Sequence, residues 1–264
     1  MKKIINGLSV FLSGSQESKA IVFVHGFPFD HYMWDEQINE LSKSYFYVTY
    51  DIRGLGESIV GDGQFTMESF ADDLEKIIDE LKLNRPVLCG LSMGGYISLR
   101  AVERRQDKFS ALILCDTKSS ADDNEGKLKR TAAIKQINSG EFNPFVESFV
   151  LNCFGEKFLR ENNAEYRKVV ERSKTNNQLG VKGCLLAMVS RTDTTGSLSK
   201  IKLPTLIICG SEDKLSPPDQ MKKMAEQIPN SEFVLVQNAG HMTPIEYPQV
   251  VNQAIKNFLT KNRI

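Results

Sequence analysis

Short runs of aliphatic residues recur along the chain, and most are continuous rather than alternating with polar residues. They cover Ile21 to Val24, Tyr45 to Val48, Val87 to Cys89, Ala111 to Cys115, Leu206 to Cys209 and Phe233 to Val236. Continuous runs of this length are typical of strands buried on both faces of a parallel sheet. Amphipathic stretches such as Met67 to Leu83 and Met221 to Ile228 lie between them and indicate helices. The alternation predicts an α/β fold, in which a mostly parallel, twisted sheet of about eight strands is flanked by helices.

Residues 119 to about 195 interrupt this alternation. The segment has no convincing strand, and helix candidates lie near 124–138, 141–153, 162–176 and 178–191, the second of them rich in phenylalanine. A stretch of about 75 residues without a strand is long for the connection between two parallel strands. We therefore expect a helical cap at 119–195, inserted into a core of residues 1–118 and 196–264. The alternative is that these helices simply cover the sheet.

The charge balance narrows the choice of partners. The 264 residues include 33 basic and 33 acidic side chains, so the formal net charge is zero. Because no global field would attract a polyanion or an anionic surface, we expect neither a nucleic acid nor a membrane as partner, but a small neutral molecule. No stretch approaches the roughly 18 continuous apolar residues of a membrane span.

Cysteine usage and the first residues bear on the compartment. Five cysteines is an odd number, and Cys89, Cys115 and Cys209 each end an apolar run, where a thiol usually acts as a small hydrophobe. This favours a reducing, cytoplasmic location. Residues 1–14 superficially resemble a signal peptide, but Asn6 and Gly7 break the apolar stretch and no small-residue cleavage site follows. We expect an edge strand there.

The run from Val87 to Val102 contains the most informative local pattern, Gly90-Leu91-Ser92-Met93-Gly94 between an apolar strand and a helix. A sharp strand-to-helix turn strains the backbone of the serine and needs residues without bulk two positions before and after it. Such a turn exposes the hydroxyl and directs N–H groups of the helix start toward the atom that it attacks. Ser92 is therefore the candidate nucleophile.

A serine hydroxyl needs an adjacent base to accept its proton. The chain has three histidines, His25, His31 and His241. His241 lies in a glycine-containing loop just after the last apolar strand, which would place it at the edge of the sheet where Ser92 emerges. We predict that His241 is the base.

The base in turn needs an acid that orients it and stabilises the imidazolium. Asp213 follows the penultimate strand and precedes two prolines, so it would lie on a short rigid loop. Asp116, at the end of the Ala111 to Cys115 strand, and Glu212 are the alternatives. The chain order Ser, Asp, His favours Asp213, whereas a turn-forming or capping role is the simpler interpretation of Asp116.

Attack on an acyl carbon creates an oxyanion, which two backbone N–H donors would stabilise. The candidates are the N–H of Met93, next to the nucleophile, and the N–H of Phe27, in the loop that begins at His25. No metal or other cofactor is expected, because three histidines and no Cys-x-x-Cys offer little for zinc.

These motifs together resemble the α/β-hydrolase fold superfamily, of the single-domain esterase, lactonase and haloperoxidase type. The matching segments, in order, are 25–28, 51–58, 90–95, 210–213 and 240–242. The resemblance implies that the cap lies between the sixth and seventh strands, and that the turn from Asp51 to Ser58 is mainly structural. A serine nucleophile speaks against a haloalkane dehalogenase, and the His-Gly-Gly-Gly run of another esterase branch is absent from the sequence.

The leading hypothesis is a serine hydrolase that cleaves a small carboxylic ester or lactone through Ser92, His241 and Asp213 and an acyl-enzyme. The same triad could serve a carbon–carbon bond hydrolase, a perhydrolase or an acyltransferase. A ligand receptor on the same fold with slow turnover is an alternative of a different class. The phenylalanines of the expected cap and Met188 suggest an apolar substrate group, although such stripes are more often core.

Overall fold

The computed structural model describes residues 1–41 and 44–264. Within them, one sheet contains β1 (Lys2–Ile5), β2 (Leu8–Ser13), β3 (Ala20–Val24), β4 (Phe46–Tyr50), β5 (Val87–Leu91), β6 (Ala111–Cys115), β7 (Thr205–Gly210) and β8 (Ser231–Val236). The strand order is β1-β2-β4-β3-β5-β6-β7-β8. From β4 to β8 all neighbours are parallel, and β2 is antiparallel to both β1 and β4. The predicted fold class, a mostly parallel eight-stranded sheet, is confirmed.

The N-terminal segment differs from the prediction of one edge strand. β1 and β2 form a hairpin in which Ile5 pairs with Leu8, so Asn6 and Gly7 alone make the turn. Both have positive φ, 51° and 78°, as the central residues of a tight hairpin turn of this kind require. The single-strand prediction was therefore wrong: β1 forms the edge, and β2 lies inside the sheet against β4.

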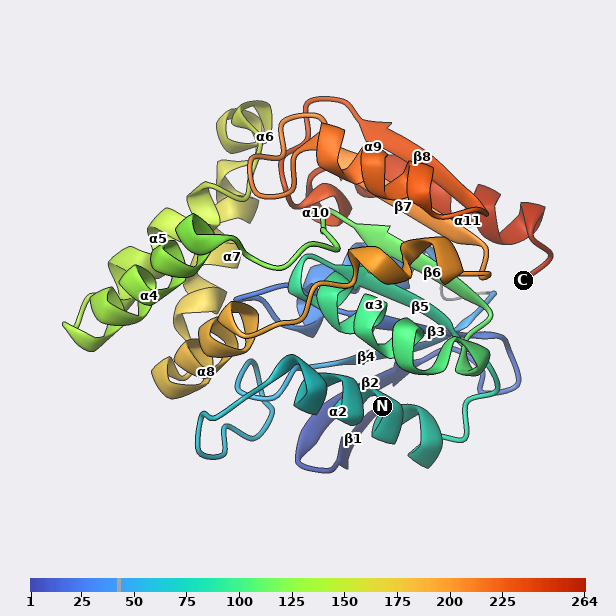
Figure 1. Ribbon diagram of the computed structural model, residues 1–264, viewed down its shortest axis with the longest axis horizontal. Helices are drawn as coiled ribbons and strands as arrows, with labels where there is room; N and C mark the ends of the chain where they lie inside the picture. The colour runs from blue at the N-terminus through green and yellow to red at the C-terminus, as the bar shows by residue number, and fades with distance from the viewer. Residues whose placement is uncertain (42–43) are drawn as a thin grey trace.

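Helices cover both faces of the sheet. α2 (Met67–Glu80), α3 (Met93–Arg105) and α9 (Pro218–Gln227) lie in front of it in Figure 1, and α11 (Pro248–Lys261) lies behind, packed on α1 (Asp35–Leu41). α2 begins with a capping box between Thr66 and Ser69 and buries an apolar stripe that includes Phe70 and Leu74. Shorter helical turns are η1 (His31–Trp34), η2 (Gln106–Lys108), η3 (Thr195–Lys200) and α10 (Thr243–Glu246).

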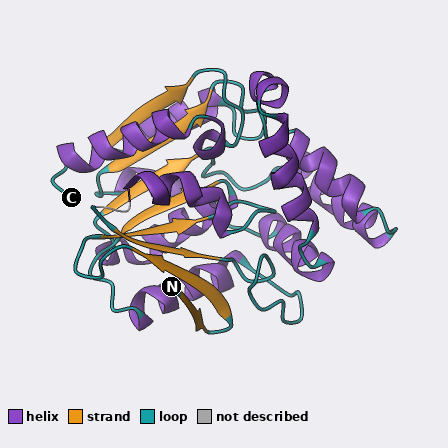
Figure 2. Ribbon diagram, turned by 180° about the vertical axis from the view of Figure 1, so that it is seen from behind, coloured by secondary structure: helices purple, strands orange, loops and turns teal. Residues whose placement is uncertain are grey.

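Five helices connect β6 to β7 and lie together past the carboxyl ends of the strands (Figures 1 and 2). They are α4 (Asn124–Asn138), α5 (Phe142–Leu151), α6 (Glu156–Glu161), α7 (Asn163–Lys174) and α8 (Gln178–Val189). We call them the cap. Residues 119–195, all described, contain no strand. The sequence did not predict α6, because this six-residue helix buries one side chain, Phe158, and so has no apolar periodicity.

The two connectors of the cap are bonded to each other. Thr194 donates its N–H to the carbonyl of Ser119 at 3.1 Å, and the hydroxyls of Ser119 and Thr195 lie 2.9 Å apart. Arg191 donates to the Ser120 carbonyl and forms an ion pair with the buried Asp122. The chain thus leaves and rejoins the core at one place. The division into 1–118 with 196–264 and 119–195 stays a prediction.

The core is built on the central strands. Every residue of β3, β5, β6 and β7 is buried. Trp34 packs against Phe23 of β3, with ring centroids 4.8 Å apart. The five cysteines are free and buried, as expected of small hydrophobes, whereas the cytoplasmic location stays a prediction. None of the helices in the described ranges is long and apolar enough to cross a membrane.

Candidate active site

Ser92 occupies a strained turn between β5 and α3. Its φ of 54° and ψ of −115° lie in a region that L-residues rarely adopt, which marks a conformation imposed by its surroundings. A Cβ added at Gly94 would lie 2.1 Å from the carbonyl oxygen of Val24, and one at Gly90 would lie 2.4 Å from the carbonyl oxygen of Gly94. The two glycines are therefore needed for the backbone to pack this closely. Ser92 itself is only half-buried.

Asp213 and His241 meet at the same edge of the sheet, past the ends of β7 and β8. His241 Nδ1 lies 2.8 Å from Asp213 Oδ2, and both residues are buried. Asp213 Oδ1 accepts the N–H groups of Leu215 and Ser216 at 2.8 and 2.9 Å. These two donors fix the carboxylate, so that one oxygen is left for the imidazole, whose Nε2 has no hydrogen-bond partner among the described residues.

The connection from Ser92 to this pair runs through the segment after β6. Ser92 donates its N–H to Cys115 and accepts a hydrogen bond from the Thr117 hydroxyl at 2.7 Å. Asp116 accepts hydrogen bonds from the N–H of Gly210, in the loop of Asp213, and from the hydroxyl of Thr243, in the loop of His241. It therefore holds both loops next to the end of β6. Among residues 1–41 and 44–264, the Ser92 hydroxyl has no hydrogen-bond partner. The three residues thus share one sheet edge, but the Ser92–His241 link is open.

The alternative acids occupy other positions. Burial, and the charge of nearby Asp213, raise the pKa of Asp116 well above its usual range. Its oxygens are taken by Gly210 and Thr243, so Asp116 ties loops together and makes no bond to His241. Glu212 Oε2 instead accepts the N–H of Glu156 in the cap at 3.2 Å. Asp213 is the acid in contact with His241.

The other two histidines are engaged in the core. His25 Nε2 accepts the N–H of Ile52 at 2.8 Å, and burial lowers the pKa of this imidazole. His31 lies 2.8 Å from Asp51 and stacks on Phe11. Asp51 also accepts the N–H of Glu57, in agreement with a structural role for the turn from Asp51 to Ser58.

Two backbone N–H groups face no acceptor. In the part of the chain that the structure describes, the N–H groups of Phe27 and Met93 donate to no protein atom. Met93 is the first residue of α3, where N–H groups have no intrahelical acceptor. A Cβ added at Gly26 would lie 3.4 Å from Ser92 Cβ, so the loop that carries Phe27 runs directly past Ser92. The role of these two N–H groups as an oxyanion hole stays a prediction.

Aromatic side chains of the cap cover the Phe27 loop. The Phe149 ring meets the edge of Phe27 with centroids 5.3 Å apart, and Phe145 lies 6.4 Å from Phe27. Both come from α5, the helix whose phenylalanines stand out in the sequence. These contacts give the Phe27 side chain an aromatic, apolar neighbourhood.

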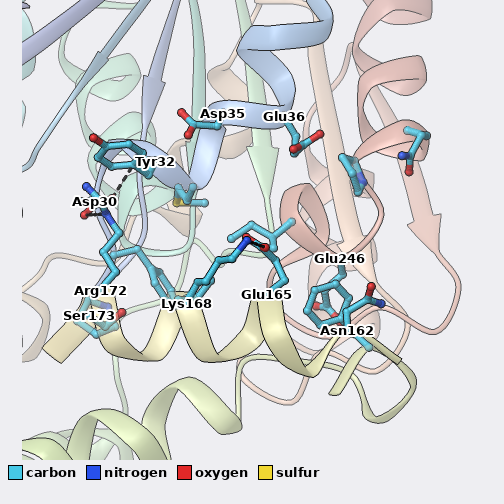
Figure 3. A pocket seen from close by; sticks show the side chains of 18 residues that line it. Asp30, Tyr32, Asp35, Glu36, Asn162, Glu165, Lys168, Arg172, Ser173 and Glu246 are labelled. Carbon is cyan, nitrogen blue, oxygen red and sulfur yellow. Dashed lines mark hydrogen bonds and ion pairs between the residues drawn. The ribbon is translucent and has the colours of Figure 1, made fainter. Parts of the chain in front are cut away.

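A cavity of about 590 Å³ lies between α7 and the core, and its lining includes none of Ser92, Asp213 and His241. Figure 3 shows its charged rim, in which Arg172 pairs with Asp30 and Lys168 with Glu165. Pro28, Phe29 and Glu246 line it as well, so it borders the segments that follow Phe27 and His241.

The described residues contain two groups of the ligand types that metals prefer, Asp30 with His31 and Asp51, and Asp116 with Cys209 and Asp213. Their carboxylates already accept backbone, threonine, histidine or arginine hydrogen bonds. The expectation of no metal or other cofactor stays a prediction.

Glu246 is the residue at this site that the sequence analysis missed. Its buried carboxylate accepts the N–H groups of Gly240 and Met242, the two neighbours of His241. Its partners are backbone groups, which leave no pattern of side chains. The available signal was a glutamate five positions after the histidine, in the turn Thr243-Pro244-Ile245-Glu246.

Comparisons with known proteins identify the family and the fold. The family model described as the alpha/beta hydrolase fold matches residues 19–248. The 3-oxoadipate enol-lactonase 1 of Acinetobacter baylyi is 28% identical over 252 residues, which are 96% of this chain and 92% of that protein. A solved thermophilic esterase from Thermogutta terrifontis is 33% identical with a TM-score of 0.93, covering 100% of this chain and 99% of that chain. The enol-lactonase from Burkholderia xenovorans LB400, 24% identical with a TM-score of 0.90 over 98% of this chain and 100% of that chain, shares the fold.

Proposed function

The chain belongs to the α/β-hydrolase fold family, and from this premise we propose that it is a serine hydrolase that cleaves a small carboxylic ester or lactone. The observation that carries the proposal is the convergence at one sheet edge of a strained, half-exposed serine and a buried, hydrogen-bonded His241–Asp213 pair. The family and its relatives support hydrolase activity on this fold.

In the proposed reaction, Ser92 Oγ attacks the acyl carbon while His241 Nε2 takes the hydroxyl proton. Asp213 holds the proton on Nδ1 and stabilises the imidazolium. The carbonyl oxygen becomes an oxyanion that the N–H groups of Phe27 and Met93 stabilise. His241 then returns the proton to the leaving alkoxide, and water releases the acyl group from Ser92 by the same steps. A lactone differs only in that its leaving group remains attached.

The first step requires the Ser92 hydroxyl to turn toward His241 Nε2. Catalytic hydrogen bonds are often long or unformed without substrate and tighten in the complex. The half-exposed hydroxyl has no other partner among the described residues, so nothing has to be broken for it to turn.

The surroundings of the two N–H donors favour an uncharged, apolar acyl group. Phe145 and Phe149 stand beside Phe27, and the ring contacts among these three residues are aromatic and apolar. A solved relative is an esterase and a curated relative is an enol-lactonase, which support an ester or a lactone as substrate class.

The test is the Ser92→Ala variant, assayed with p-nitrophenyl acetate beside wild type and Ser139→Ala, a control at the exposed end of α4. We expect kcat to fall by about 10³-fold or more for Ser92→Ala and to stay at the wild-type value for Ser139→Ala. A fluorophosphonate probe should label Ser92, as located by mass spectrometry. A folded Ser92→Ala protein that retains wild-type turnover would refute the proposal.

A substrate panel then separates the remaining chemistries. Short esters, enol-lactones and β-diketones distinguish ester, lactone and carbon–carbon bond cleavage, and hydrogen peroxide or an alcohol as acceptor exposes perhydrolysis or acyl transfer. Sustained turnover supports an enzyme, whereas one burst followed by tight product retention indicates a receptor.

A further inference from the structure

The carboxylate of Glu246 binds three backbone N–H groups from two parts of the chain. Oε2 accepts from Gly240 at 3.1 Å and from Gly155 at 2.8 Å, and Oε1 accepts from Met242 at 3.1 Å. Gly240 and Met242 flank His241, whereas Gly155 lies between α5 and α6 in the cap. One side chain thus holds both peptide neighbours of the proposed base and joins them to the cap.

The backbones at this junction are in direct contact. His241 donates its own N–H to the carbonyl of Cys153 at 2.7 Å. A Cβ added at Gly240 would lie 2.5 Å from the nitrogen of Gly155, and one at Gly155 would lie 2.7 Å from the carbonyl oxygen of Asn238. The His241 loop therefore has no room to shift independently of the cap segment from Cys153 to Gly155.

No lysine, arginine or histidine forms an ion pair with Glu246 in the described part of the chain, so backbone N–H groups hold this carboxylate. A glutamate is costly to bury, and three charge-assisted hydrogen bonds offset that cost. Glu246 makes these bonds only to the His241 loop and the cap, which indicates that its role lies in joining them.

We infer that Glu246 is a positioning residue: its ionised carboxylate fixes the two peptide groups beside His241 to the cap, and so sets where the imidazole lies relative to Ser92. The inference rests on the proposed function. The inference adds that a shift of the cap also shifts the His241 imidazole relative to Ser92.

Ionisation of Glu246 gives the coupling a pH dependence. Burial raises the pKa of this carboxyl to about 7, although the hydrogen bonds from Gly240, Gly155 and Met242 lower it. The protonated form places a hydrogen on an oxygen that faces N–H donors, so the junction weakens as the pH falls through about 7. Glu246 lines the cavity, through which protons can reach it (Figure 3). The titratable groups around it are His241, Cys153, Tyr247 and, on the cavity lining, Asp30, Tyr32, Asp35, Glu36, Glu165, Lys168 and Arg172.

The variant that tests this role is Glu246→Gln, because the amide keeps the size of the side chain but presents donors where the N–H groups need acceptors. Glu212→Gln is the matched control, since Glu212 accepts the N–H of the next cap residue, Glu156, and its side chain makes no bond to residues 240–242. With p-nitrophenyl acetate at pH 8, we expect kcat to fall by about tenfold or more in Glu246→Gln, with KM within about threefold, as when a group that acts only in the transition state is displaced. Glu212→Gln should match wild type. In Glu246→Gln, the inflection of kcat at about pH 7 that Glu246 contributes should be absent.

Nuclear magnetic resonance tests the same role without substrate. In wild type, the amide protons of Gly155, Gly240 and Met242 should titrate together with an inflection at about pH 7, and the Nδ1 proton of His241 should respond at the same pH. In Glu246→Gln the common inflection should be absent, and the His241 signal should be shifted or broadened. If Glu246→Gln does not fold, the wild-type titration still decides.

The inference is overturned if Glu246→Gln keeps wild-type kcat, pH profile and His241 signal, or if the three wild-type amides titrate independently. Failure of the proposed function is distinct. If the proposed function is wrong, Ser92→Ala keeps full turnover, while the His241 signal still depends on Glu246.

Discussion

Replacing Asp213 by asparagine tests the geometry of the proposed triad most directly. Asp213 Oδ1 accepts two N–H groups, from Leu215 and Ser216, and Oδ2 faces His241 Nδ1. In Asp213→Asn, the amide oxygen must take the Oδ1 position, because an NH₂ group there would face two donors. The NH₂ group then points at His241 Nδ1, which must become an acceptor.

The size of the effect follows from the tautomer. With Nδ1 as acceptor, the proton of the neutral imidazole lies on Nε2, and Nε2 cannot accept the proton of Ser92. The same change in a serine protease triad lowers kcat by about 10⁴-fold, which corresponds to about 5.4 kcal/mol at about 1.36 kcal/mol per factor of ten. We expect a loss of this order, with little change in KM.

The assay is steady-state hydrolysis of p-nitrophenyl acetate at pH 8, together with ¹⁵N spectra that report which ring nitrogen of His241 is protonated. Asp116→Asn and Glu212→Gln serve as controls, because neither side chain contacts His241. Glu212→Gln should match wild type, and Asp116→Asn should stay within about tenfold of it, since neither change has the tautomer effect. The reasoning is wrong if Asp213→Asn keeps a tenth of wild-type activity, or if Asp116→Asn causes the larger loss.

Three further outcomes are expected. In Gly94→Ala the added Cβ would lie 2.1 Å from the Val24 carbonyl oxygen, so the free energy of unfolding, measured in urea, should fall by about 3 kcal/mol or more. Gly196→Ala is the control, because no atom lies within 4 Å of its added Cβ, and its stability should not change. Equal stabilities of the two variants would contradict the packing argument. Burial raises the pKa of the Asp122 carboxyl, but the ion pairs with Arg130 and Arg191 outweigh burial and hold that pKa well below its usual range. The stabilisation from the ionised carboxylate is complete above the unfolded pKa of about 3.9 and is lost as the pH falls through the folded value. Asp122→Asn should therefore lower the free energy of unfolding by about 3–5 kcal/mol at pH 7 and by progressively less below about pH 4. A pH-independent loss of stability would contradict this reasoning. Phe149→Ala, beside the Phe27 loop, should raise the ratio of kcat/KM for butyrate esters to kcat/KM for acetate esters on the order of tenfold. Leu151→Ala is the control, since Leu151 is 48% exposed on the same helix, and should leave the ratio unchanged. An unchanged ratio in Phe149→Ala would place the acyl group elsewhere.

The sequence was most informative where backbone chemistry and burial dictate one solution. The continuous runs that became β3, β5, β6 and β7 are apolar on both faces, and every residue of these strands is buried. The two glycines around Ser92 mark a close approach of backbones, which the structure contains. The chain order Ser, Asp, His predicts that residues 92, 213 and 241 share one sheet edge, and the structure places them there. Their catalytic roles stay predictions.

The remaining features depend on contacts that leave no sequence pattern. The N-terminal hairpin was missed because its turn consists of two residues, Asn6 and Gly7, that also fit a break in an apolar run. Glu246 acts on backbone N–H groups of residues distant in the chain, and no side-chain motif marks such partners. The distance between the Ser92 hydroxyl and the His241 imidazole depends on side-chain placement, which residue order does not determine.

The paired connectors of the cap also have a consequence for how this fold can diversify. Because Ser119 is hydrogen-bonded to Thr194 and Thr195, the chain between them begins and ends at one place on the core. Lengthening or exchanging that chain leaves the distance between its ends unchanged, and the entropy of closing a loop grows only slowly with its length. The connectors therefore tolerate a cap of another length or sequence, provided that it keeps the contacts of Cys153 with His241 and of Gly155 with Glu246.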